Sequence, residues 1–68
     1  MNELKALVEA MRAEARLWQR RASQLDQGSD EERNEAKRFK MRAKAAVWLE
    51  ASLRLRQMAQ EHEHGKEG

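Results

Sequence analysis

The side chains with the most evident capacity for chemistry lie close together near the end of the chain. Glu61, His62, Glu63 and His64 follow one another there, and imidazole and carboxylate groups are common ligands of zinc and related ions. On a helix the two histidines would point in different directions, because residues two apart do not face each other. We therefore interpret this group as a polar surface and expect neither a metal nor any other cofactor.

The remaining sequence contains no pattern typical of a catalytic site. The chain has no Cys and only three Gly residues, so it offers neither a Cys–His couple nor a glycine-rich phosphate loop. Glu14 lies at the edge of an apolar stripe, where an ion pair or solvent accounts for it better than a role as general base. We expect a protein that is not an enzyme and that has no small-molecule substrate.

Positive charge is concentrated in the middle of the chain. The net charge is only +2, yet nine of the 14 Lys and Arg residues lie between positions 16 and 44, and residues 36–49 contain no acid. Arg12, Arg16 and Arg20 also recur every four residues. A solvated face with long side chains over apolar neighbours is the simplest interpretation. An acidic protein partner is the second, and nucleic acid comes last because no nucleic-acid motif is present.

Helices are the elements that must position these side chains. The chain lacks Pro and is rich in Ala, Leu, Glu, Arg, Lys and Gln, which favour helix. The stretch DQGSDEE (26–32) interrupts it, because Gly28 suits the end of one helix and Ser29 with Glu32 forms a capping box for the next. The pattern predicts an all-α antiparallel hairpin as a single domain over 1–68. Its expected parts are a helix at 3–26, a turn at 27–29, a second helix at 30–62 and a frayed tail at 63–68.

Apolar residues in both expected helices recur in alternating steps of four and three, a spacing typical of packed helix pairs. Large and small side chains alternate along these seams, so that each large residue can meet a small one. The residues expected in the core or in a dimer interface are Leu4, Val8, Met11, Trp18, Leu25, Met41, Ala45, Ala46 and Leu55.

Two segments, MRAEARLW (11–18) and MRAKAAVW (41–48), are nearly the same. Folding the chain back at Gly28 predicts that Met11 faces Ala45, so that the two segments pack large residues against small ones. Gene duplication and convergence on one packing pattern both explain the similarity.

The second expected helix has more apolar surface than one seam uses. Ala46, Leu49 and Leu53 form a second stripe beside the first, and an apolar arc of that width contacts more than one neighbour. Large apolar side chains are also few, since eleven of the hydrophobic residues are Ala. We expect a homodimer that forms a four-helix bundle, with a heteromeric contact through the same stripe as the alternative.

The two Trp residues have different expected environments. The fold-back at Gly28 places Trp18 near Phe39, in the core. Trp48 lies where the two apolar stripes converge and is either core or an interface anchor. The residues expected to bind a partner protein are Trp48, Leu49, Leu53, Arg42, Lys44 and Arg38. Which stripe serves the dimer and which the partner stays open.

No part of the sequence predicts a membrane segment. No apolar run approaches about 18 residues, and MNELKALVEAM at the start carries acids where a signal peptide has a basic region. The absence of Cys is typical of a reducing compartment. We expect a cytoplasmic protein.

Trp48, Leu49 and Glu50, with Ala and Leu residues around them, lie in the middle of the second expected helix of a Cys-free chain of 68 residues. In this layout the chain resembles the small early proteins of Pseudomonas transposable phages. The resemblance implies a dimeric helical hairpin that inhibits a host regulator, such as a LuxR-type quorum-sensing activator or a type IV pilus assembly factor. It also implies that Trp48 and its neighbours bind that target. A structural scaffolding protein and a polyanion binder are the alternatives.

Overall fold

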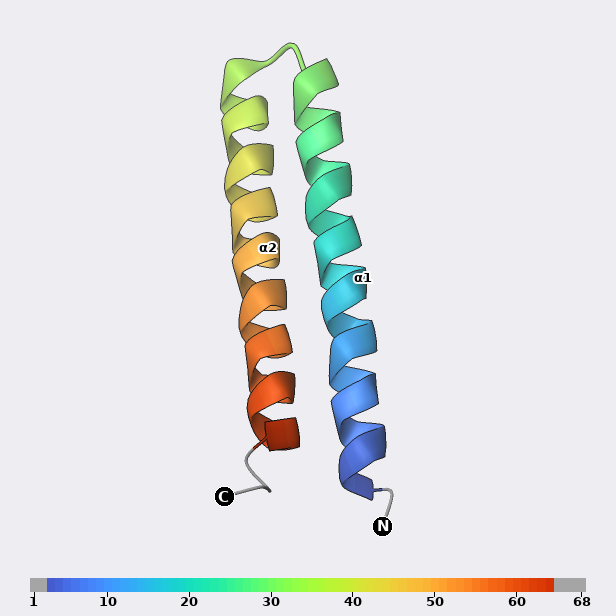
Figure 1. Cartoon of the computed structure of the whole chain (residues 1–68). Helices are drawn as coiled ribbons and strands as arrows, with labels where there is room; N and C mark the ends of the chain where they lie inside the picture. The colour runs from blue at the N-terminus through green and yellow to red at the C-terminus, as the bar shows by residue number, and fades with distance from the viewer. Residues whose placement is uncertain (1–2, 65–68) are drawn as a thin grey trace.

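The chain forms two antiparallel α-helices that lie side by side along their whole length (Figure 1). The computed structural model describes residues 3–64, in which α1 spans Glu3–Glu31 and α2 spans Glu35–His64. The hairpin is elongated, with dimensions of 52 × 18 × 10 Å. The predicted all-α hairpin is thereby confirmed.

The turn lies later in the chain than predicted. Residues 27–29, expected as the turn, belong to α1, and Gly28 does not adopt the left-handed conformation that would end a helix. Ser29, expected to cap the second helix, is buried inside α1 and donates a hydrogen bond from Oγ to the carbonyl of Asp26 at 2.7 Å. Ser29 follows Leu25 by four residues and so continues the buried side of α1. Packing along that side outweighs the local stop signal, since tertiary contacts supply most of a helix's stability.

The end of α2 also differs from the expectation. The predicted end at residue 62 is exceeded, because α2 continues to His64 and thus includes the first two residues of the expected frayed tail. The remainder of that tail, 65–68, lies outside the described residues.

Residues 32–34 connect the helices and satisfy the polar groups at both helix ends. Asn34 caps α2, because its Oδ1 accepts a hydrogen bond from the backbone N–H of Lys37 at 3.1 Å. Arg38 donates to the carbonyl of Glu32 from Nε at 3.1 Å and from Nη2 at 2.8 Å. A guanidinium at this point compensates the negative end of the α1 dipole. Asn34 therefore performs the capping that the sequence pattern assigned to Ser29 and Glu32, and Arg38 binds at the end of α1, a role that the pattern assigned to Gly28.

Small side chains form the centre of the helix interface. At every seventh residue of each helix a side chain is buried, and such small residues allow two helices to approach closely. The large apolar residues of the predicted seams are only partly buried between them. The buried residues are Val8, Ala15, Ala22 and Ser29 in α1, and Ala45, Ser52 and Ala59 in α2.

The pairing of the two helices differs from the predicted one. Trp18 packs against Trp48, with ring centroids 5.9 Å apart and ring planes at 68°, whereas Phe39, its expected neighbour, is 75% exposed. Met11 lies two helical turns before Trp18. Because the helices are antiparallel, Met11 faces residues of α2 that follow Trp48 and is far from Ala45. The pairing differs from the predicted one because the turn lies later in the chain. When the turn moves by one residue, the residue of α2 that faces a given residue of α1 changes by two positions. The repeated segments meet at their Trp ends and do not overlap along their length.

Candidate interaction surfaces

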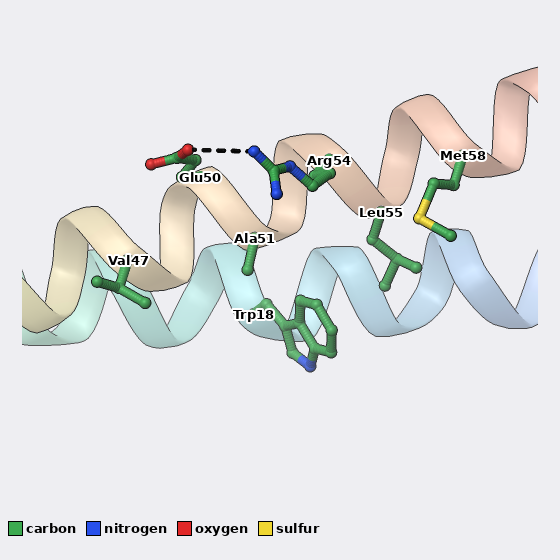
Figure 2. A pocket seen from close by; sticks show the side chains of 7 residues that line it. All are labelled: Trp18, Val47, Glu50, Ala51, Arg54, Leu55 and Met58. Atoms are coloured by element: carbon green, nitrogen blue, oxygen red, sulfur yellow. Dashed lines mark ion pairs between the residues drawn. The ribbon is translucent and has the colours of Figure 1, made fainter.

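An apolar surface runs along one side of the hairpin, where the two Trp rings meet. A groove of about 430 Å³ opens beside Trp18 (Figure 2), and a second hollow of about 380 Å³ is lined by residues of α1, among them Trp18, together with Trp48. We call this surface the Trp face. Its apolar members are Leu17, Trp18, Val47, Trp48, Ala51, Leu55 and Met58.

Heptad geometry explains why the large side chains gather on one side. In an antiparallel pair, the equivalent edges of the two helices lie on the same side of the interface. The small residues occupy one seam position in each helix, and the large residues, such as Trp18 and Leu55, occupy the other. The large side chains of both helices therefore lean toward the same side, and the small ones close the opposite side.

Several polar groups of the Trp face have partners within the hairpin. The indole N–H of Trp18 donates to Oε1 of Glu14 at 2.9 Å, and the guanidinium of Arg21 lies 5.0 Å from the ring centroid of Trp48. Such a cation–π contact contributes on the order of 0.5–1 kcal/mol at an exposed site. Glu50 and Arg54 form an ion pair at 3.6 Å at the outer rim of the groove (Figure 2). The rim therefore carries both signs of charge.

A second, basic surface lies on the other edge of the interface. A groove of about 410 Å³ is lined by Arg12, Arg16, Gln19, Arg56 and Gln60, and we call it the Arg groove. Arg12 pairs with Glu63 across the two helices at 2.6 Å. Within residues 3–64, Arg16 and Arg56 form no ion pair.

Two exposed leucines extend the Arg groove along α2. Leu49 and Leu53 precede Arg56 at helical spacing, and successive helix residues are about 100° apart, so all three lie on one edge of α2. Val47 and Met58 lie on the opposite edge, within the Trp face. The hairpin thus has two separate surfaces.

The residues predicted to bind a partner are distributed over both surfaces and the turn. Trp48 belongs to the Trp face, whereas Leu49 and Leu53 belong to the opposite edge. Arg38 contacts the backbone of the turn. Arg42 lies near it as well, paired with Asp30 at 3.5 Å. The structure therefore does not bring the predicted partner-binding set together.

The other predicted residues keep to the seams, except for Ala46 and Lys44. Ala46 is exposed on the edge of Leu49 and Leu53, and Lys44 is exposed four residues before Trp48. The predicted core and dimer residues other than Ala46 are buried or half-buried between the helices.

Val47, Ala51 and Met58 are members of the Trp face that the sequence analysis did not single out. Their spacing of four and seven residues is a recognisable stripe that also includes Leu55. The signal was hidden because Ala46, Leu49 and Leu53 form a competing stripe on the same helix. Arg56 was missed as well, since its neighbours Arg12 and Arg16 come from the other helix and become visible only with the correct pairing.

The fold defines a helical hairpin with two distinct surfaces, the Trp face and the Arg groove. In the part of the chain that the structure describes, no group of three His, Cys, Asp or Glu side chains is arranged to hold a metal ion. Neither α1 nor α2, as described, is long and apolar enough to cross a membrane. Comparisons with protein-family models, with curated proteins and with solved structures found no match for this chain.

Proposed function

We propose that this protein is a non-enzymatic modulator that acts as a homodimer and inhibits a bacterial regulatory protein by binding to it. The observation that carries the proposal is the distribution of its apolar residues. The buried interface contains mainly Ala and Ser, while large side chains such as Val47 (66% exposed) and Met58 (46% exposed) face solvent. A hairpin with so little buried apolar surface gains most of its stability from other chains.

The Trp face is the surface that we assign to the dimer. An interface around a twofold axis must be complementary to itself, and the Trp face is compatible with that condition because its rim carries Glu14 and Glu50 as well as Arg20, Arg21 and Arg54. Two copies packed through this face would form a four-helix bundle. Each copy would then keep its Arg groove on the outside.

The kind of target is taken from the resemblance to the phage early proteins. That resemblance depends on Trp48, Leu49 and Glu50, which lie in the middle of α2 of this chain. We propose a LuxR-type transcriptional activator or a type IV pilus assembly factor in the cytoplasm of a bacterial host. The exposed Leu49 and Leu53 support a protein target, since exposed apolar residues bordered by polar ones mark protein contacts.

Two measurements test the proposal. Light scattering at low micromolar concentration should give about twice 8.0 kDa, and titration of a purified activator or pilus assembly factor should show saturable binding. A monomer that unfolds cooperatively would refute the dimer. Open-ended assemblies with no affinity for either target would instead support a scaffolding role.

A further inference from the structure

We propose that the Arg groove, with Leu49 and Leu53, binds an acidic amphipathic helix of the partner protein. This inference rests on the proposed function, and it names the surface and the chemistry of the recognised segment. Trp48, which the sequence pattern predicted to bind the partner together with Leu49 and Leu53, is not part of this site.

The first argument is the shape of the apolar strip. Leu49 and Leu53 are 40% and 51% exposed, and together with Arg56 and Gln60 they recur along one edge of α2. From Leu49 to Gln60 this edge is about 16 Å long at 1.5 Å per residue, the length of three turns. A partner helix binds such an edge through apolar residues at similar spacing.

The second argument is charge complementarity. Arg16 and Arg56 line the same groove from different helices, and neither forms an ion pair within residues 3–64. Arg12, which also lines it, has Glu63 as its partner. Guanidinium groups recognise carboxylates through paired hydrogen bonds. Asp or Glu residues flanking the apolar strip of a bound helix would supply the missing counter-charges.

The same charges argue against two other occupants. A second copy in this groove would place Arg16 and Arg56 near their own equivalents, and like charges in contact are unfavourable. A nucleic-acid backbone would meet the carboxylate of Glu63, which contacts Arg12 at the groove, and it would leave Leu49 and Leu53 without apolar contacts. Carboxylates set among apolar side chains fit better than a continuous line of phosphates.

The test uses the full chain and a designed, fluorescein-labelled peptide of about 18 residues, or five helical turns. The peptide carries Leu at helical spacing along one face and Glu on both flanks, and its control carries Gln in place of every Glu. Fluorescence anisotropy should show saturable binding of the Glu peptide and at least about tenfold weaker binding of the Gln peptide. The difference should shrink as salt rises, because these charges are exposed.

Matched variants locate the binding surface. Arg56→Glu should weaken binding of the Glu peptide by about tenfold, whereas Arg33→Glu, a reversal at an exposed residue of the turn, should leave it nearly unchanged. Leu53→Ala should weaken it too, whereas Phe39→Ala, at an apolar residue that is 75% exposed and lies outside both surfaces, should not. Circular dichroism would verify that each variant is helical.

Several results would overturn the inference. These are the absence of binding by the Glu peptide, equal losses in Arg56→Glu and Arg33→Glu, or tighter binding of a DNA duplex than of the peptide. Loss of peptide affinity on dilution to monomers that circular dichroism shows to be still helical would place the site across the dimer, and this too would contradict a groove within one hairpin. A wild-type chain that is monomeric yet binds the peptide would refute the proposed dimer alone, so the two failures are distinguishable.

Discussion

Buried serines show how single residues adapt to the narrow helix interface. Ser29 and Ser52 are 1% and 0% exposed, and each donates its hydroxyl hydrogen to a carbonyl three residues earlier, on Asp26 and Leu49, at 2.7 Å. A buried hydroxyl is costly only when it lacks a partner, and in the described residues no buried side-chain N or O is unpaired. Serine therefore acts at these positions as a small residue, much like alanine.

Gly28 provides a test at the scale of one residue. It lies inside α1 without positive φ, so replacement by Ala should gain up to about 1 kcal/mol of helix propensity. The new Cβ would lie 2.7 Å from Cε of Met41, the mobile end of a flexible side chain. We expect Gly28→Ala to raise the free energy of unfolding by about 0.5 kcal/mol in thermal and urea melts. In a Met41→Ala background the gain should be larger, and a clear destabilisation in that background would contradict the helical geometry of Gly28.

The turn shows how two elements compete for the same residues. Gly28, Ser29 and Glu32 form a local pattern that ends one helix and begins another, yet α1 passes through it as far as Glu31. Asn34 then supplies the cap of α2 and Arg38 binds the exposed carbonyl of Glu32. The outcome depends on burying one more seam residue, because local signals of this kind contribute only about 1 kcal/mol each.

Substitution of the two candidate caps tests this assignment at the scale of the helix. Asn34→Ala should lower the free energy of unfolding by about 1 kcal/mol. Asn34→Asp should lower it much less, because aspartate also caps helices well. Ser29→Ala should change it by less than about 0.5 kcal/mol, since the hydroxyl donates within its own helix and accepts from α2 only a long hydrogen bond, at 3.4 Å from Nε of Arg42. The measurement is chemical denaturation at fixed protein concentration. A larger loss of unfolding free energy for Ser29→Ala than for Asn34→Ala would support the turn predicted at 27–29 instead.

The whole molecule is shaped by the separation of its two surfaces. Both Trp rings and the Val47 stripe lie on one side, and the Arg groove with Leu49 and Leu53 lies on the other. A protein with one self-complementary face and one basic face can dimerise and bind a target at the same time. Surface ion pairs such as Arg12–Glu63 contribute little to the fold itself, about 0–1 kcal/mol.

A pair of charged substitutions tests the dimer assignment at the scale of the whole molecule. Val47→Glu would bury a carboxylate in the proposed dimer interface, so we expect its dissociation constant to rise by at least about tenfold. Phe39→Glu alters a more exposed apolar residue that lies outside the Trp face, and its dimer should persist. Light scattering over a dilution series is the measurement. Dissociation caused by Phe39→Glu but not by Val47→Glu would exclude the Trp face as the dimer interface.

The sequence by itself determined that the chain forms two long helices and that small residues alternate with large ones along each seam, because helix propensity and periodicity are local properties. It could not locate the turn or the facing pairs. In the tertiary structure the burial of Ser29 outweighs a favourable capping pattern. Because the predicted turn lay a few residues too early, Trp18 was expected beside Phe39, whereas it packs against Trp48. The candidate surfaces depend on that pairing. Trp48 and Leu49 are adjacent in the chain yet lie on opposite edges of the interface, and Arg16 and Arg56, forty residues apart, line one groove.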